Sequence, residues 1–320
     1  MDRTPGSAHW SNPSRLKTRH LMLLLHLDEQ GSVLRAAEAA RMTQPAASKL
    51  LAEMEATLGV PLFERHARGV QPTWYGQVLI RRARSALLEI SRAQEEIAAL
   101  RDGRMGQASI GTVVNPGTNL VPNAVAEVKR LHPDIVVRID MDYSRPLVAR
   151  LLDGQLDLVV GRILDATGAV DLEFEPLAEE PHSVIVRHGH PLAASRKPLR
   201  HADLAPYGWI MPPADSVLRT RLETMFLERG LPAPGNVVET SALPVITNLL
   251  RASDLLTALP EEAVAPYIQA RQLAVLPLDL GVGMESFGII LRRGHLLSPA
   301  AQTMLDALRA TARQLYPKVE

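Results

Sequence analysis

The hydrophobic pattern of this chain changes at about residue 103, and this change divides the 320 residues into two parts. Residues 16–100 are rich in Ala, Leu, Arg and Glu and predict helices joined by short turns. From residue 108 onward, short β-branched runs alternate with amphipathic stretches, which is typical of an α/β domain with a largely parallel sheet. Two glycines in residues 102–107 predict a hinge between the parts.

In the second part, the expected strands are short and buried, and the expected helices lie between them. Strands are predicted at 108–114, 135–139, 156–160, 184–187, 237–240, 255–259 and 287–291. Helices are predicted at 119–130, 145–153, 217–229, 243–251 and 298–315.

Two short helices with a tight turn between them are predicted in the first part. Ser32 precedes a helix over 33–40, and Thr43 is expected to cap a second helix that ends before Gly59. The second helix has an apolar stripe and, opposite it, a polar and mostly uncharged face. That face contains Gln44, Pro45, Ser48, Lys49 and Glu53. This pattern favours a helix-turn-helix, in which small and amide side chains contact base edges and phosphates.

A basic hairpin is predicted directly after these helices, over residues 61–72. Arg65 and Arg68 are placed where a wing would reach a phosphate or the minor groove of DNA. Residues 1–106 carry 15 Lys and Arg against 11 Asp and Glu, whereas residues 107–320 carry 20 against 24. A basic first part favours a polyanionic partner. The alternative is a two-helix packing element with a solvated basic loop.

A long helix is predicted from Thr73 to about Arg101, on the order of 40 Å in length. Its apolar positions step by three and four residues, and a second column widens the seam. We expect a second copy of the chain to cover this stripe, which predicts a homodimer; the alternative is packing on the chain's own body. The seam consists of Ile80, Ala83, Leu87, Ile90, Gln94 and Ile97, and the column of Leu79, Ala86, Ala93 and Leu100.

Several function classes lack the residues that they need. The chain has no cysteine, which excludes disulfides, Cys-ligated zinc and thiol catalysis. No G-x-S-x-G, P-loop or G-x-G-x-x-G motif occurs, so an enzyme has no catalytic constellation, and we expect no cofactor. His188 and His190 lack a third metal ligand at suitable spacing, apart from His182. Residues 1–14 read as a loose tail without a signal peptide, and no membrane span is predicted, which favours the cytoplasm.

The motifs of the first part together resemble the amino-terminal signature of LysR-type transcriptional regulators. The resemblance rests on Ala36-Ala37, Thr43-Gln44-Pro45-Ala46-Ala47-Ser48, Leu58-Gly59-Val60-Pro61-Leu62-Phe63-Glu64-Arg65, Pro72-Thr73 and Gly76, spread over about sixty residues. Residues 42–51 and 68–76 are most similar to a subgroup that includes the galactose-binding-protein regulator and the protocatechuate-pathway regulator.

The resemblance implies a domain order. It comprises a flexible tail (1–14), a winged helix-turn-helix (15–72), a dimerising linker helix (73–102), a hinge (103–107) and an α/β sensor like a periplasmic binding protein (108–320). The sensor would have two subdomains, 108–177 with 278–320, and 178–277. A homotetramer binding an interrupted DNA dyad and acting on RNA polymerase is also implied.

Carried over by position, the resemblance implies two groups of site residues. The DNA contacts would come from Thr43, Gln44, Pro45, Ser48, Lys49, Arg65 and Arg68. A small-molecule effector would be bound between the subdomains by Asn115, Thr118, Ser144, Arg162, Thr240 and Ser241.

Alternatives remain for individual residues of both groups. One alternative is that Lys49 is simply a solvated charge. Another is that Arg162 forms an interdomain ion pair instead of binding an anion, and a third is that Thr240 and Ser241 only cap the following helix. Backbone N–H groups at 115–118 would favour a carboxylate, phosphate or sugar oxygen. The effector class stays open among aromatic acids, sugars and small carboxylates. The competing function is a small-molecule-binding protein or enzyme with an accessory basic helical domain.

Overall fold

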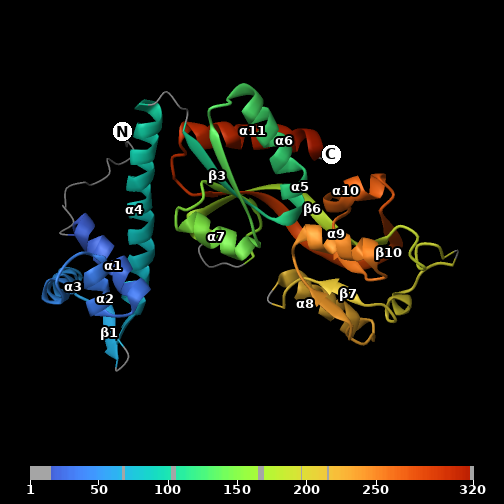
Figure 1. Ribbon diagram of the computed structural model, residues 1–320, viewed down its shortest axis with the longest axis horizontal. Coiled ribbons are helices and arrows are strands. Elements are labelled where there is room, and N and C mark those ends of the chain that lie inside the picture. The colour runs from blue at the N-terminus through green and yellow to red at the C-terminus, as the bar shows by residue number, and fades with distance from the viewer. Residues whose placement is uncertain are drawn as a thin grey trace, which may run out of the picture. The chain divides into compact units, whose positions relative to one another are not determined.

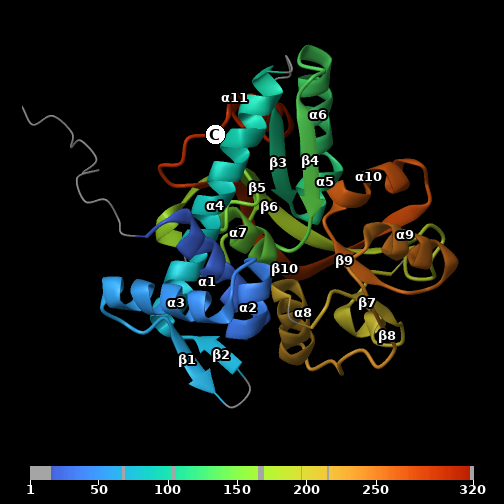
Figure 2. The same cartoon turned by 60° about the vertical axis from the view of Figure 1, so that its left-hand side comes forward.

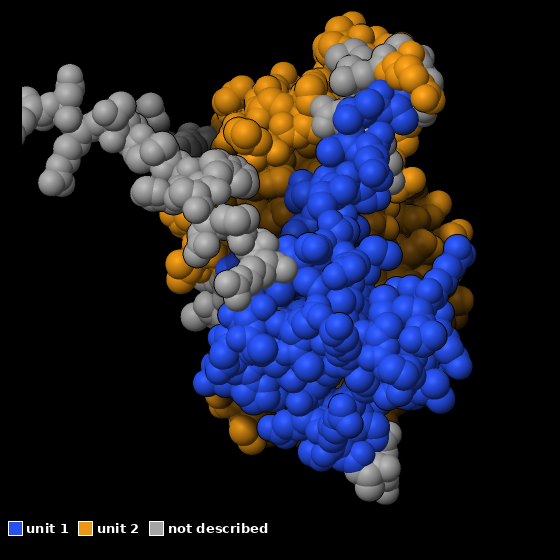
Figure 3. Space-filling view, turned by 90° about the vertical axis from the view of Figure 1, so that its left-hand side faces the viewer, with its two compact units in different colours: residues 1–98, 153–155 blue, residues 99–152, 156–320 orange. Residues whose placement is uncertain are grey.

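The computed structural model describes residues 16–66, 69–101, 106–164, 169–195, 197–214 and 216–317. The chain forms two compact units, one of residues 1–98 with 153–155 and the other of residues 99–152 with 156–320 (Figure 3). Three predicted features lie outside the described residues, namely the tail at 1–14, Arg68 and most of the hinge.

Unit 1 contains the predicted pair of short helices, the hairpin and the long helix (Figure 1). One core joins them, with Leu23, Leu27 and Met54 fully buried at its centre. The elements are α1 (Thr18–Gln30), α2 (Val33–Ala39), α3 (Gln44–Leu58), β1 (Phe63–His66), β2 (Gly69–Pro72) and α4 (Trp74–Arg101).

The ends of α3 follow from local chemistry, with one correction. Thr43 occupies the position before the helix with extended backbone, but its side chain makes no capping hydrogen bond, and the same holds for Ser32 before α2. At the other end, Gly59 adopts a left-handed φ of 72°, and its N–H donates to the carbonyl of Glu55 at 2.8 Å. The predicted glycine stop is confirmed.

The hairpin is fixed to the helices through backbone groups. A carboxylate oxygen of Glu55 accepts from the N–H groups of Leu62 (2.8 Å) and Phe63 (3.3 Å). The carbonyl of Gly31 accepts from the N–H of Val70 at 2.9 Å. Gly69 has a φ of 136°, and a Cβ there would lie 2.1 Å from the Gly31 oxygen. The close approach therefore requires glycine at position 69.

The apolar seam of α4 is covered over only part of its length within unit 1. Ile80 and Ala83 are buried in the core of the unit. Ile90 and Ile97, farther along the same seam, are 49% and 67% exposed. The expectation that nothing in the first part of the chain covers the stripe is therefore wrong for its first turns, because α4 packs there on the short helices.

Unit 2 is built on a six-stranded sheet of order β4-β3-β5-β10-β6-β9. β3 is parallel to β4 and β5, whereas β10 is antiparallel to β5 and β6, and β6 is antiparallel to β9. The sheet is therefore mixed, and the prediction of a largely parallel sheet is wrong. The strands are β3 (Gln107–Thr112), β4 (Val136–Met141), β5 (Leu158–Gly161), β6 (Leu172–Arg187), β9 (Thr257–Leu259) and β10 (Leu273–Arg292).

Two long antiparallel strands, β6 and β10, divide unit 2 into two lobes that share them. Phe287 pairs with Ala178 beside β5, while Leu273 pairs with Arg187 near β9, and register shifts interrupt the ladder in between. We define lobe I as residues 106–178 and 287–317, and lobe II as residues 182–282. Lobe II adds the parallel pair β7 (Trp209–Met211) and β8 (Val237–Glu239).

Helices cover both faces of the strands in each lobe. In lobe I, α6 and α11 pack on one face and α7 on the other (Figure 1). In lobe II, Val184 and Val186 face α8, whereas Ile185 between them faces α9 and α10 (Figure 2). The helices are α5 (Val114–Thr118), α6 (Leu120–Leu131), α7 (Ser144–Leu152), α8 (Val217–Glu228), α9 (Leu243–Ala252), α10 (Glu261–Gln269) and α11 (Pro299–Leu315).

The expected elements of the second part differ from the structure in several places, and β6 and β10 extend well beyond the strands predicted at 184–187 and 287–291. The strand expected to be buried at 135–139 is the edge strand β4, on which Val136, Ile139 and Met141 are 43%, 45% and 52% exposed. The helix expected from 119 is preceded by the separate short helix α5. β7 and α10 were not predicted. No helix in the described part of the chain is both long and apolar enough to cross a membrane.

Candidate functional sites

The amino-terminal half of α3 presents the predicted polar face to solvent. Thr43, Gln44, Pro45 and Lys49 are exposed and Ser48 is partly exposed. The Gln44 amide nitrogen donates to the Ser48 hydroxyl at 3.0 Å, so these two side chains share the outer surface one turn apart. The Thr43 hydroxyl, which does not accept the cap hydrogen bond, is available to an external group.

An open groove of about 470 Å³ lies between the start of α2, the start of α3 and the hairpin. The exposed Arg65 on β1 and Gln44 on α3 both line it, so the predicted helix contacts and the predicted wing contact face one surface feature. The groove is lined by Ser32, Val33, Leu34, Gln44, Arg65, His66, Gly69 and Val70.

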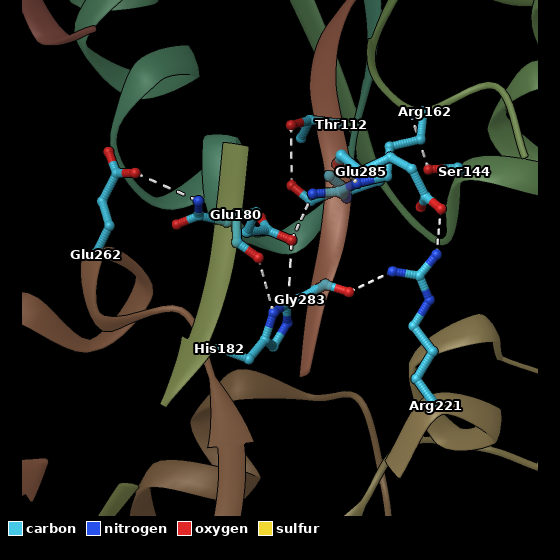
Figure 4. A network of polar contacts seen from close by, with 11 residues as sticks. Thr112, Ser144, Arg162, Glu180, His182, Arg221, Glu262, Gly283 and Glu285 are labelled. Carbon is cyan, nitrogen blue, oxygen red and sulfur yellow. Dashed lines mark hydrogen bonds and ion pairs between the residues drawn. The ribbon is translucent and has the colours of Figure 1, made fainter. Parts of the chain in front are cut away.

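In unit 2, a buried polar network surrounds Arg162, directly after β5 (Figure 4). The guanidinium donates through one terminal nitrogen to Glu180 Oε2 at 2.5 Å and through Nε to the Glu285 carbonyl at 2.6 Å. The backbone N–H of Arg162 donates to the Ser144 hydroxyl at 3.1 Å. Because Glu180 and Glu285 belong to the strands shared by the lobes, Arg162 forms the ion pair that the sequence left open as an alternative to an anion clamp.

Glu262 of α10 extends this network from lobe II to lobe I. Its Oε2 accepts from the Asn115 amide at 3.3 Å, and its Oε1 accepts from the Asn119 amide at 2.8 Å and the Tyr316 hydroxyl at 2.7 Å. Burial and the neighbouring Glu262 carboxylate raise the pKa of Tyr316. Three donors of lobe I thus converge on one carboxylate of lobe II.

His182 lies beside Glu180 on β6 and is buried. Its Nδ1 is 3.0 Å from the carbonyl oxygen of Glu180, and its Nε2 is 4.0 Å from the Glu180 carboxylate. Burial, assisted by the charges of Arg162 and Arg221, lowers the pKa of His182 to about 4. The ring is therefore neutral at neutral pH. Arg221 of α8 donates to the carbonyl of Gly283 and to the carboxylate of Glu285.

The structure brings together some of the predicted effector residues and not others. Asn115, Ser144 and Arg162 are buried members of the network. The hydroxyl of Thr118 is engaged within α5, where it donates to the Asn115 carbonyl at 2.7 Å. Thr240 accepts from the N–H of Ala242 at 3.2 Å in the turn before α9, and Ser241 is exposed beside it. The residue that precedes α9 is Ala242 and no side chain caps the helix, so the capping alternative is wrong for both.

The N–H groups expected to be accessible at 115–118 belong to the short helix α5. Asn115 and Pro116 are buried, and the N–H of Gly117 donates to the Val113 carbonyl at 3.1 Å. Of the N–H groups in this segment, that of Gly117 is thus engaged within the turn.

Sequence reasoning missed most of the acidic members of the network. Glu180, Glu262 and Glu285 were not singled out, and neither was Arg221. One signal was available for Glu285, because Asp279 and Glu285 interrupt an otherwise largely apolar run over 273–291. An interruption of that kind in a buried strand predicts partnered charges.

Of the two histidines His188 and His190, the buried His190 is held by contacts within the fold. His190 is fully buried, its Nδ1 accepts from the N–H of Leu192 at 3.1 Å, and its Nε2 lies 3.3 Å from the Asp254 carbonyl. Its ring stacks at a tilt on Tyr207, with 4.7 Å between centroids. These contacts use both ring nitrogens within the fold.

Comparison with known proteins identifies the same two-part organisation. Residues 18–77 match the family described as bacterial regulatory helix-turn-helix protein, lysR family, and residues 101–313 match the LysR substrate binding domain. Among curated relatives, the transcriptional regulator GbpR of Azospirillum brasilense is 39% identical over 306 residues, covering 95% of this chain and 89% of the relative. PcaQ of Agrobacterium fabrum is 29% identical over 302 residues, covering 94% and 97%.

Solved structures share the fold over nearly the whole chain. ArgP from Mycobacterium tuberculosis has a TM-score of 0.68 at 18% identity, covering 94% of this chain and 99% of that chain. Full-length CbnR in complex with its target DNA has a TM-score of 0.58 at 21% identity, covering 92% and 100%. The chain belongs to the LysR family of transcriptional regulators, with a helix-turn-helix DNA-binding domain followed by an effector-binding domain, and it is not an enzyme.

Proposed function

We propose that the exposed start of α3 reads the operator in the major groove while the hairpin contacts the flanking backbone. Gln44 is placed to make a bidentate contact with an adenine edge, and Lys49 to supply phosphate affinity. Thr43, Pro45 and Ser48 complete the helix surface, with Arg65 and Arg68 on the wing. The observation that carries this assignment is the shared groove, which Gln44 and Arg65 both line.

A substitution series tests this assignment. Gln44→Ala should weaken specific binding by roughly 1–3 kcal/mol and relax one operator position, because a bidentate base contact is lost. Lys49→Ala should weaken binding to all sequences and reduce its salt dependence. Gln77→Ala, an exposed glutamine on α4, is the matched control. Unchanged operator preference in the Gln44 variant would remove that residue from base recognition.

We infer that the exposed second half of the α4 seam pairs with the same helix of a second copy. Ile90 and Ile97 stand seven residues apart on one stripe, which is the repeat of a coiled-coil contact. Replacing both with Ser should convert dimers to monomers at micromolar concentration in sedimentation experiments. Replacing the buried Ile80 tests a different effect, the stability of unit 1. A variant that stays dimeric contradicts the α4 interface. Tetramer formation from two such dimers and contact with RNA polymerase are further parts of this proposal.

We propose that a small-molecule effector controls the arrangement of the two lobes, within the cytoplasm where the DNA lies. Support comes from the Arg162–Glu180–Glu285 contacts, which connect lobe I to both shared strands. An effector that binds one lobe arrangement better shifts the population and changes the spacing of the DNA-binding domains. Asn115 and Ser144 would lie at the effector site, with Thr118, Arg162, Thr240 and Ser241 as the remaining candidates.

The decisive experiment is selection of genomic DNA fragments by the purified full-length protein at two salt concentrations. A recurring dyad that survives the higher salt is expected. Binding that is uniform in sequence and collapses with salt would contradict operator recognition. A bulky replacement of Asn115 or Ser144 should then abolish the effector response while operator binding persists. Normal induction in both variants would refute the effector-site assignment.

A further inference from the structure

Two buried oxygen atoms in the network have no hydrogen-bond partner among the described residues. They are Oε1 of Glu180 and Oδ1 of Asn115, on side chains of residues only 6% and 4% exposed. The other carboxylate oxygen of Glu180 is bound by Arg162, and the Asn115 amide nitrogen donates to Glu262. Asn115 is also close enough to Glu180 to oppose the effect of burial, which raises the pKa of that carboxyl.

Both unpartnered atoms are acceptors, and each therefore needs a donor. Leaving a buried polar atom unpaired costs roughly 1–3 kcal/mol, and more when the group is charged. Burial raises the pKa of Glu180, and the charge of the paired Arg162 opposes that rise. In its ionised form this carboxyl group can only accept hydrogen bonds. A ligand that donates to both oxygens would recover this cost.

The cations of the network are already committed to other groups. Arg162 donates to Glu180 and to the Glu285 carbonyl, and its guanidinium lies 5.9 Å from the Phe287 ring centroid. Arg221 donates to Gly283 and Glu285. The network thus contains three carboxyl groups, those of Glu180, Glu262 and Glu285, but only the two guanidinium groups of Arg162 and Arg221. An incoming anion would meet an excess of negative charge.

We propose that the effector carries no negative charge where it meets this network and presents hydroxyl or ammonium donors to Glu180 and Asn115. This inference rests on the proposed function, because it names the ligand class of the same lobe-controlled site. It selects polyols and amines over aromatic acids and small carboxylates, two of the three classes that the sequence left open.

The ion pair predicts what happens when the Glu180 charge is removed. Glu180→Gln neutralises the acceptor and releases the Arg162 guanidinium from its carboxylate partner. The variant should lose at least tenfold in sensitivity to the natural effector and become responsive to carboxylates. Glu175→Gln, a partly exposed residue of the same strand paired with Arg309, is the matched control.

The test uses full-length protein bound to its selected operator. The probe is a low-molecular-weight cell extract that is divided on a strong anion exchanger into unretained and retained fractions. The readouts are the melting temperature of the protein and the mobility of the operator complex. We expect the unretained, neutral and cationic fraction to shift both for the wild type and for the Glu175 variant, and to lose its effect on Glu180→Gln.

The outcomes separate this inference from the function on which it rests. Activity confined to the retained, anionic fraction overturns the donor assignment while leaving effector control intact. An unchanged response of Glu180→Gln to the unretained fraction also overturns it. If neither fraction alters an operator complex that forms normally, effector control itself fails. Failure to form a specific operator complex at all refutes the proposed function at an earlier step.

Discussion

Acidification should destabilise unit 2 through His182, and the structure sets the pH window. The ordinary pKa of histidine, 6.5, applies to the unfolded chain, whereas burial lowers the pKa of His182 to about 4 in the folded state. Between these values the unfolded chain binds more protons than the folded one. The free energy of unfolding therefore rises with pH across this window and falls as pH is lowered from 7 toward 4.

The magnitude follows from the two pKa values. One pKa unit corresponds to about 1.4 kcal/mol. Lowering the pH from 7 to 5 crosses most of the window, and it should cost about 2 kcal/mol through this residue alone. The charges that face the ring are the Glu180 carboxylate, which favours the protonated form, and Arg162 and Arg221, which oppose it.

The assay compares the wild type with His182→Asn, which retains a nitrogen donor near the position of Nδ1 but does not titrate. Urea unfolding followed by the fluorescence of Trp209, fully buried in lobe II, reports on this unit when Trp10 and Trp74 are replaced by Phe. The difference between pH 7 and pH 5 should be about 2 kcal/mol smaller in the variant. His190, whose pKa burial also lowers, contributes equally to both proteins. An identical pH dependence in the two proteins would refute the reasoning.

Two further predictions concern backbone and carboxylate contacts. Gly69→Ala should destabilise unit 1 by about 2–3 kcal/mol in thermal unfolding, because the added Cβ meets the Gly31 carbonyl. Gly59→Ala, where the added Cβ has open space around it, should cost about 1 kcal/mol. Equal losses of stability in the two variants would contradict the close approach at Gly69. Glu262→Ala should lower the free energy of unfolding of unit 2 by about 2 kcal/mol in urea, since it leaves the donors of Asn119 and Tyr316 in lobe I unpaired. A loss of stability no larger than that of Glu261→Ala would contradict this role of Glu262.

Unit 1 was predictable from the sequence because its signals are local. The three- and four-residue spacing of apolar side chains locates α3, and Gly59 ends it through a conformation that glycine adopts easily. The exposed polar face at Gln44 and Ser48 follows from the same periodicity. Coverage of the α4 seam was not predictable, because whether Ile80 meets the short helices depends on how the helices pack in three dimensions.

Unit 2 was predictable as a set of elements but not as a topology. Only the carboxyl-terminal ends of β6 and β10 were predicted, as the short strands 184–187 and 287–291, because polar residues interrupt the apolar pattern earlier in each strand. The antiparallel pairing of β6 and β10 joins segments that lie far apart in the chain, so no local sequence pattern predicts it. β7 is three residues long, and α10 contains Pro266, so both lack the usual pattern of their class.

The candidate effector site shows the same limit. Asn115, Ser144 and Arg162 were expected on the basis of the family resemblance, and they do come together. Their partners Glu180 and Glu262 are 65 and 147 residues away from Asn115 in the chain. Only the shared strands and the packing of α10 on α5 bring these groups into contact.

The position of β10 in the sheet bears on how the protein is made. This strand follows the other described strands in chain order, yet in lobe I it lies between β5 and β6, which have no ladder to each other without it. During translation, the sheet of lobe I therefore stays open between β5 and β6 until residues 287–292 have left the ribosome, while most of lobe II has already been made. Strand pairings of such long sequence separation form slowly. Chains truncated before residue 287 should accordingly expose two sheet edges and be prone to aggregate.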